Sequence, residues 1–260
     1  MKALVKLGGT LLDSAESRVR LVREIVDLAR GGAEVAVVHG GGKQMTRFLA
    51  ERNVESRFVN GLRVTSPEVL DAVLKVLGGA VNHELVASFA AAGARAVGLS
   101  GLDAGTAIAE RLSEELGAVG RPVRSDGALM KLLASNGFVP VIACIGGDAE
   151  GNIYNVNADQ MAIVCAAGFG ADRLFFLTDV DGVRTADGSI APVLTPSDIK
   201  DLISSGVATG GMQAKLESAR RALDMGVGEI VIAPGQRAGI VAELAGGVSV
   251  GTRIVKGGGK

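Results

Sequence analysis

Residues 3–9 read Ala-Leu-Val-Lys-Leu-Gly-Gly, an apolar strand pattern that ends in a lysine and a pair of glycines. A second apolar run, 35–38, leads into His39-Gly40-Gly41-Gly42, and a further glycine turn, Thr209-Gly210-Gly211-Met212, precedes Lys215. Glycine lets backbone N–H groups approach an anion closely, and the start of a helix adds the positive end of its dipole. These turns and lysines predict a surface for a polyphosphate and a second anion, as a phosphoryl-transfer enzyme needs.

Strand-like runs alternate with helical patterns along most of the chain. This alternation predicts an α/β protein with a mainly parallel sheet that is covered by helices on both faces. A long helix is expected from Pro67 to about Ala92, and the segment 58–65 before it is expected to be extended. We expect a substrate-binding half over about 1–170 and a nucleotide-binding half over about 171–260. Because no Pro/Ser-rich linker separates the halves, one sheet is expected to cross both.

Composition excludes some classes of partner. The 260 residues are 48% hydrophobic and carry 27 basic against 28 acidic side chains, so nothing favours nucleic acid or an anionic membrane. Cys144 and Cys165 lie in apolar runs, which indicates buried free thiols in a reducing compartment. The first strand begins almost at Met1, and no apolar stretch approaches the ~18 residues of a membrane span. We expect a cytoplasmic protein without a signal peptide.

Lys6 and the stretch Asn155-Val-Asn-Ala-Asp159 are candidates for chemistry. A lysine at the end of an apolar strand either extends to solvent or neutralises an anion, and the adjoining glycines favour the anion. Asn157 is equally well explained as a helix cap. Asp159 places a carboxylate in the first helical turn, where it could hold two lysine side chains in position for phosphoryl transfer.

Two further segments follow strand-like runs. The stretch 178–183, Thr-Asp-Val-Asp-Gly-Val, is either a tight turn or part of a nucleotide site. Arg63 is either a solvated side chain or the partner of a substrate carboxylate, which its guanidinium group suits. His39 is expected to pack within the glycine turn. The sequence contains no P-loop motif, and the dinucleotide-binding fingerprint is absent after both early strands.

In their order along the chain, these motifs resemble the amino-acid kinase superfamily, and the resemblance covers nearly the whole sequence. It is carried by Lys6–Gly9, His39–Gly42, Asn60–Thr65, Glu115–Gly120, Asn155–Gln160, Leu177–Gly182, Gly211–Lys215 and Gly251–Ile254. The resemblance implies an open three-layer αβα sandwich. Within the superfamily, the pattern is most similar to the branch that uses ATP to phosphorylate the side-chain carboxylate of N-acetyl-L-glutamate, giving an acyl phosphate, in arginine biosynthesis.

The resemblance also implies residue roles. Lys6 and Lys215 would flank the transferred phosphoryl group, and Asp159 would orient both. Gly9, Gly41 and Gly42 would shape the site with backbone groups, while Arg63 and Asn155 would hold the far end of the acyl amino acid. The nucleotide cleft is expected to be formed by Thr178, Asp179, Val180, Asp181, Gly182, Val183, Val207, Ala208, Thr209 and Met212. Mg²⁺ is expected on the ATP phosphates, held mostly by them and by water, without a dedicated ligand cluster.

Some positions depart from the family pattern. His83 and Leu102 stand where many members of this branch have lysine. Leu102 is also similar to related kinases that act on carrier-linked aminoadipate, so another N-acylated or carrier-linked glutamate or aminoadipate is the alternative substrate. A nucleotide-sensing member without catalysis would be expected to lose Lys6, Lys215 or Asp159, and all three are present.

The resemblance bears on assembly as well. The resemblance implies that arginine-sensitive members form hexamers whose subunits are joined by an extra N-terminal helix. In this sequence five residues precede Lys6. We therefore expect a homodimer that arginine inhibits little. Its surface is expected on the long helix from Pro67 to about Ala92, which carries an apolar stripe of Val69, Val73, Val76, Leu77 and Val81, and part of that stripe is expected to pack on the core of its own chain. The glycine-rich tail 256–260 is expected to lack regular structure.

Overall fold

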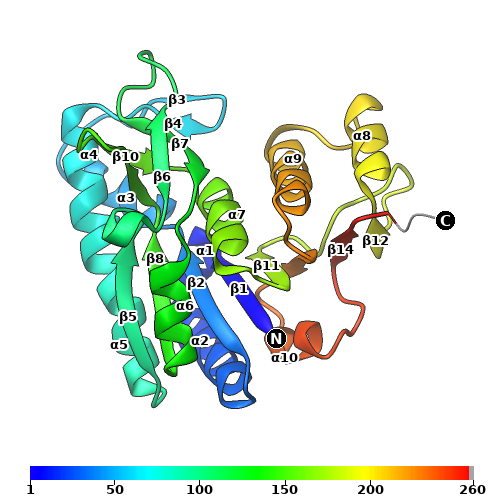
Figure 1. The fold of residues 1–260 in the computed structure, drawn as a ribbon. Coiled ribbons are helices and arrows are strands. Elements are labelled where there is room, and N and C mark those ends of the chain that lie inside the picture. Colours follow the sequence, from blue (N-terminus) through cyan, green and yellow to red (C-terminus); the bar gives the residue numbers. More distant parts are fainter. Residues whose placement is uncertain (258–260) are drawn as a thin grey trace.

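An eight-stranded sheet runs through the computed structural model, which describes residues 1–257 (Figure 1). Residues 258–260 of the tail lie outside the described part. In spatial order the strands are β12 (Val193–Leu194), β14 (Thr252–Val255), β13 (Glu229–Pro234), β11 (Arg173–Thr178), β1 (Lys2–Leu7), β2 (Glu34–His39), β8 (Phe138–Ala143) and β5 (Arg95–Ser100). All neighbours are parallel except β13 and β14. The expected single sheet is confirmed, because β11 of the second half pairs with β1.

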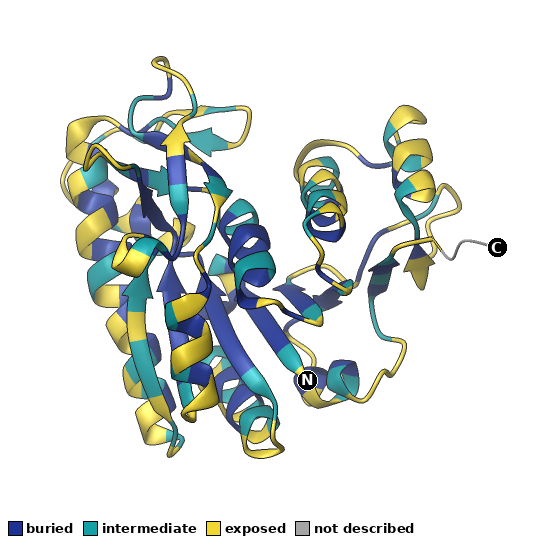
Figure 2. Ribbon diagram, in the orientation of Figure 1, coloured by how far each residue is buried: buried dark blue, intermediate teal, exposed yellow. Residues whose placement is uncertain are grey.

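Helices cover both faces of this sheet, as the alternation of patterns predicts. One face carries α1 (Gly9–Asp13), α2 (Ala15–Arg30), α3 (Gly42–Ala50), α4 (Pro67–Val73), η1 (Leu74–Val81), α5 (Asn82–Ala91) and α10 (Ile240–Ala245). The other carries α6 (Ala128–Ser135), α7 (Ala158–Phe169), α8 (Pro196–Ser204) and α9 (Gly210–Asp224). The central strands β13, β11, β1, β2 and β8 are almost wholly buried (Figure 2). Two apolar cores result, one on each face.

Strand β1 shows how the two cores are divided. Successive side chains of a strand point to opposite faces. Ala3, Val5 and Leu7 belong to the core on the α2 side, and Leu4 belongs to the core on the α7 side. Lys6 follows Leu4 by two positions, so the same alternation directs its side chain toward α7.

A small closed barrel and a hairpin sit at the carboxyl end of the sheet. The barrel consists of β6 (Ile108–Arg111), β7 (Val119–Arg124), β9 (Ile145–Gly147) and β10 (Ile153–Val156). The hairpin consists of β3 (Phe58–Val59) and β4 (Leu62–Arg63). Strands β7 and β10 and the barrel are not expected from the sequence, because the strands are short and β7 contains Gly120 and Pro122, which disfavour strands.

The long helix has the expected length, but its packing corrects one prediction. It runs without a break from Pro67 to Ala91, and residues 74–81 are wound as a π-helix. The apolar stripe expected to form the dimer surface is buried inside the chain itself: Val69, Val73, Val76, Leu77 and Val81 are each at most 5% exposed. These side chains fill the apolar core on the α2 side, so the stripe is not available to a second copy.

Cys144 and Cys165 are buried free thiols, as expected. Within residues 1–257, none of the helices combines the length and the apolar character that a membrane crossing requires. A short 3₁₀ turn, η2 (Asp103–Gly105), completes the regular structure.

Candidate active site

Asp159 lies between the two lysines that the sequence analysis singled out. Its Oδ1 is 2.7 Å from Lys6 Nζ, and its Oδ2 is 2.6 Å from Lys215 Nζ. Lys6 lies near the end of β1, Asp159 in the first turn of α7 and Lys215 in the second turn of α9, so the contact joins both halves of the chain. Lys6 is 8% exposed, so it does not extend to solvent. The carboxylate thus holds two ammonium groups side by side.

The charges of this trio depend on one another. Burial raises the pKa of the Asp159 carboxyl, but the two lysines outweigh burial and hold that pKa below its usual range. Burial also lowers the pKa of Lys215, which Asp159 partly offsets. Two lysines against one carboxylate leave a net positive charge in a largely buried place. Such a place favours an anion.

Asn157 sets the start of α7 and hence the position of Asp159. Its side-chain oxygen accepts hydrogen bonds from the backbone N–H groups of Asp159, at 2.9 Å, and Gln160, at 3.2 Å. Asn157 is therefore the N-cap, which was one of its two sequence interpretations.

The glycine turns after β1 and β2 pack directly against each other. Gly40 donates its N–H to the Leu7 carbonyl at 3.3 Å. A Cβ atom on Gly9 would lie 3.3 Å from the Gly42 nitrogen, so a side chain there would crowd the neighbouring turn. Within residues 1–257, the N–H groups of Gly9, Gly41 and Gly42 donate to no protein acceptor. They are available to an anion.

A pocket beside the glycine turns brings Arg63 and Asn155 together. It is lined by Gly40, Gly41, Gly42, Met45, Phe58, Gly61, Leu62, Arg63, Val73, Leu77, Val119, Cys144, Asn155, Val156, Asn157 and Ala158. We call it the acyl pocket. Arg63 donates to Thr46 Oγ1 at 2.9 Å and to Ser56, and burial lowers its pKa. Asn155, on β10, donates to Thr65 Oγ1 at 3.1 Å.

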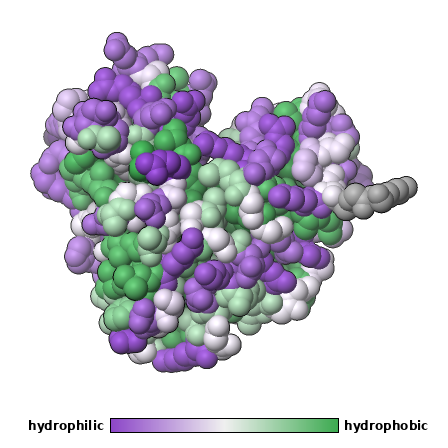
Figure 3. Space-filling view, in the orientation of Figure 1, coloured by the Kyte–Doolittle hydropathy of each residue, from purple (hydrophilic) through white to green (hydrophobic). Residues whose placement is uncertain are grey.

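A second pocket, which we call the nucleotide pocket, lies beside β11 and α9. It is lined by Asp179, Val180, Asp181, Gly182, Arg184, Val207, Ala208, Thr209 and Met212. Neither lysine lines either pocket, but each acts on a residue that lines one. Lys6 acts electrostatically on the thiol of Cys144, whose pKa burial raises to about 12, and Lys215 interacts with Asp179. The surface is hollowed between the two sides, one built around β7 and the other around α8 and α9 (Figure 3).

The comparisons with known proteins agree with this geometry. The model of the amino acid kinase family matches residues 1–234. The chain belongs to the amino acid kinase family. It is 58% identical over 255 residues to a protein named acetylglutamate kinase from Solibacter usitatus, covering 98% of this chain and 99% of that one.

Other known proteins support the assignment of this chain to the family. It is 44% identical to a protein of the same name from Acidobacterium capsulatum, over 98% of this chain and 99% of that one. Among solved structures, smu.665 from Streptococcus mutans UA159 superposes with a TM-score of 0.81 at 26% identity, and the match covers 98% of each chain.

Two of the residues expected at the nucleotide do not line its pocket. Val183 is fully buried, and its N–H donates to Thr252 Oγ1 at 2.8 Å. Thr178 ends β11, where its hydroxyl donates to Asp179 Oδ1 at 3.0 Å. Arg184 also lines the pocket and was not predicted, because a single exposed arginine carries no local signal of its partner.

Among the described residues, no group of three or more His, Cys, Asp or Glu side chains is arranged to hold a metal ion. The carboxylates Asp179 and Asp181 lie at the nucleotide pocket, where they could complement a phosphate-bound cation.

Proposed function

We infer that the protein uses ATP to phosphorylate the side-chain carboxylate of N-acetyl-L-glutamate, giving N-acetyl-L-glutamyl 5-phosphate in arginine biosynthesis. The observation that carries this inference is the Lys6–Asp159–Lys215 trio, placed between an acyl pocket and a nucleotide pocket in a member of the amino acid kinase family. The relative at 58% identity supports the choice of substrate, because it is named acetylglutamate kinase.

The trio accounts for the chemistry without a general base. A glutamate side chain is already ionised at pH 7, because its ordinary pKa is about 4.3. The attacking carboxylate and the phosphoryl group are both anionic, so the main obstacle is their repulsion. Lys6 on the acyl side and Lys215 on the nucleotide side would neutralise the charge between them. Asp159 would keep both ammonium groups in place.

The two pockets divide the substrates. Arg63 and Asn155 would bind the α-carboxylate and the acetamido group, and the free N–H groups of Gly9, Gly41 and Gly42 would receive the reacting oxygens. The nucleotide pocket would take ATP. Mg²⁺, held by the phosphates and water, supplies charge neutralisation when it is bound. We propose a substrate-binding and dimerisation lobe over about 1–170 and a nucleotide-binding lobe over about 171–260.

The test is a coupled assay of ATP consumption with four acceptors: N-acetyl-L-glutamate, N-succinylglutamate, free glutamate and aminoadipate. N-acetyl-L-glutamate should give the highest kcat/KM. A clear preference for another acceptor would reassign the substrate. Nucleotide binding without turnover of any acceptor would instead indicate a sensing protein.

We propose that the protein is a homodimer, formed on the sheet edge instead of the buried stripe. Strand β5 is the terminal strand of the sheet and is half-exposed along its length (Figure 2). Beside it, Leu74 of η1 is 36% exposed and Leu102 is 40% exposed. An open strand edge flanked by apolar side chains favours pairing with a second copy, which a two-fold axis would close into a dimer.

A further inference from the structure

His39 is a buried titratable residue that the mechanism above does not use. It ends β2, between Leu7 of β1 and Ala143 of β8, and it is fully buried. It directly precedes the glycine turn whose N–H groups face the acyl pocket. A buried imidazole needs a hydrogen-bonding partner for each ring nitrogen.

Both partners of His39 are present, and they define its protonation state. Nδ1 lies 2.9 Å from the Gly40 carbonyl oxygen, and Nε2 lies 3.0 Å from Asn82 Nδ2. A carbonyl only accepts and an amide nitrogen only donates. Nδ1 therefore carries the hydrogen and Nε2 accepts. Burial lowers the pKa of His39 to about 4, so the ring is neutral at pH 7.

The orientation of the Asn82 amide is set by its other neighbours. Its Nδ2 also donates to the Val141 carbonyl at 2.9 Å. On the opposite side, a Cβ atom on Gly98 of β5 would lie 2.1 Å from Asn82 Oδ1. Gly98 does not have a positive φ, so it is needed here for space and not for its backbone conformation. Strand β5 thus leaves room for the amide that holds the imidazole.

The contact with His39 fixes one peptide plane of the glycine turn. In a trans peptide the carbonyl and the following N–H point in opposite directions, and the described residues contain no cis bond. With the Gly40 carbonyl directed at the buried imidazole, the Gly41 N–H is directed away from it, toward the acyl pocket that Gly41 lines. Because a glycine pair restricts rotation little, this plane needs an outside partner to hold it.

We propose that Asn82 and His39 are positioning residues that hold the Gly40–Gly41 peptide so that the Gly41 N–H meets the reacting oxygens. This role rests on the proposed function and assigns a task to two residues that touch neither substrate. Asn82 fixes the tautomer of His39, and His39 then directs the carbonyl of Gly40.

Kinetics of substituted enzymes test the positioning role. Asn82→Ala and His39→Leu should each lower kcat roughly 10- to 100-fold, the scale of a misplaced reacting group, while KM for ATP changes little. His39→Asn should retain more activity than His39→Leu, because its amide nitrogen can replace Nδ1 as the donor to Gly40. His83→Asn is the matched control: His83 is exposed on α5 and should tolerate the change. Unchanged kcat in Asn82→Ala and His39→Leu would overturn the proposal.

Gly98→Ala separates positioning from simple packing. The added Cβ should displace the Asn82 amide and lower both Tm and kcat, although His39 and Asn82 are intact. In the double variant Gly98→Ala with Asn82→Ala the clash with the amide is removed and only a 3.3 Å contact with Val86 Cγ2 remains, so Tm should be close to that of Asn82→Ala while kcat stays low. If kcat recovered together with Tm, the pair would serve packing alone.

The tautomer can be measured directly, because the chain contains only 2 histidines. ¹⁵N spectra of histidine-labelled protein, assigned with His83→Asn, should show His39 with a protonated Nδ1 and a bare Nε2 at pH 7. A protonated Nε2 would overturn the proposal even if the enzyme were inactive. A wild type that turns over no acceptor would refute the proposed function, whereas an active wild type with fully active variants would refute the positioning role alone.

Discussion

At the residue scale, Asp159 is the centre of the charges in the candidate active site. A carboxylate that pairs with two lysines from different elements lets two like charges approach each other in a buried place. Removing either lysine leaves the carboxylate paired with the other, so the fold should survive the loss. The stabilisation of the transition state should be lost, because each ammonium group is proposed to neutralise the charge that develops on one side of the phosphoryl group.

Lys6→Met and Lys215→Met should therefore each lower kcat by roughly 100-fold, or about 3 kcal/mol, with little change in Tm. Lys75→Met is the control, because Lys75 forms an exposed ion pair with Asp71 on the long helix. Initial rates with saturating ATP and N-acetyl-L-glutamate provide the measurement. A variant at either site with near-normal kcat would show that its assigned role is wrong.

Arg63→Lys should raise KM for the acyl amino acid and leave KM for ATP nearly unchanged. Lysine keeps the charge but loses the forked geometry that can bind a carboxylate through two hydrogen bonds. Arg121→Lys, on the exposed side of β7, is the control. Equal rises in both KM values would indicate a folding defect in place of a binding role.

His39 predicts a pH dependence of stability. Its folded-state pKa, about 4, lies below the ordinary value of 6.5, so the unfolded chain takes up the proton first. Stability should be complete above pH 6.5 and should fall as the pH decreases toward 4, by up to about 3 kcal/mol. Urea unfolding of wild type and His39→Asn between pH 7.5 and 5 measures this. Equal slopes for the two proteins would contradict it.

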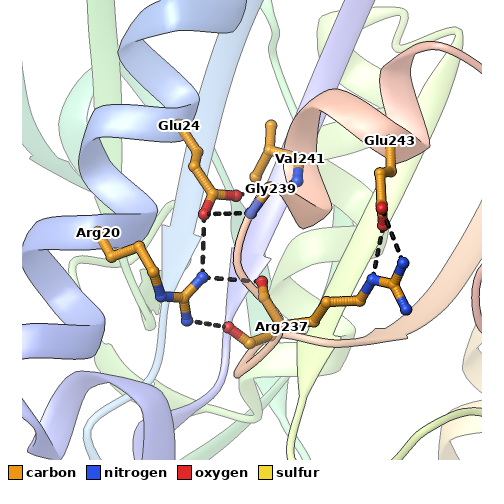
Figure 4. A network of polar contacts seen from close by, with 7 residues as sticks. Arg20, Glu24, Arg237, Gly239, Val241 and Glu243 are labelled. Atoms are coloured by element: carbon orange, nitrogen blue, oxygen red, sulfur yellow. Dashed lines mark hydrogen bonds and ion pairs between the residues drawn. The ribbon is translucent and has the colours of Figure 1, made fainter.

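At the scale of elements, the N-terminal N–H groups of helix α10 donate hydrogen bonds to a side chain of another helix (Figure 4). Glu24 of α2 accepts from the N–H groups of Gly239, at 2.9 Å, and Val241, at 3.1 Å. Arg20 of the same helix pairs with Glu24 and donates to the Gly235 carbonyl at 2.6 Å. Because α2 lies in the first half of the chain and α10 in the second, these contacts join the two proposed lobes.

Glu24→Ala should lower the free energy of unfolding by about 1–3 kcal/mol, because it leaves two helix-end N–H groups without their acceptor and removes the ion pair with Arg20. Glu24→Gln should cost less, since one acceptor oxygen remains. Glu55→Ala, in an exposed loop, serves as the control. The comparison requires equilibrium urea unfolding. If Glu24→Ala lowered the free energy of unfolding no more than Glu55→Ala does, the contacts of Glu24 would not contribute to stability.

At the scale of the whole molecule, the open edge at β5 should decide the oligomeric state. Leu102→Arg and Leu74→Glu place charges beside that edge and should convert the dimer to a monomer at micromolar concentration. Val19→Glu is the control, as Val19 is an exposed apolar residue of α2. Light scattering reports the mass. A dimer that survives both edge substitutions, or a wild type that is monomeric or hexameric, would contradict the proposed surface.

Local sequence pattern was enough to predict the parallel sheet, the glycine turns at strand ends and most candidate residues of both pockets, and it left the cap at Asn157 as one of two interpretations. The contacts between distant segments became visible in the fold alone. The barrel around Asn155, the imidazole–amide contact of His39 with Asn82, and the burial of the stripe from Val69 to Val81 all arise this way. Periodicity shows that one face of a segment is apolar. It does not show which segment covers that face, because this depends on packing between residues that are far apart in the sequence.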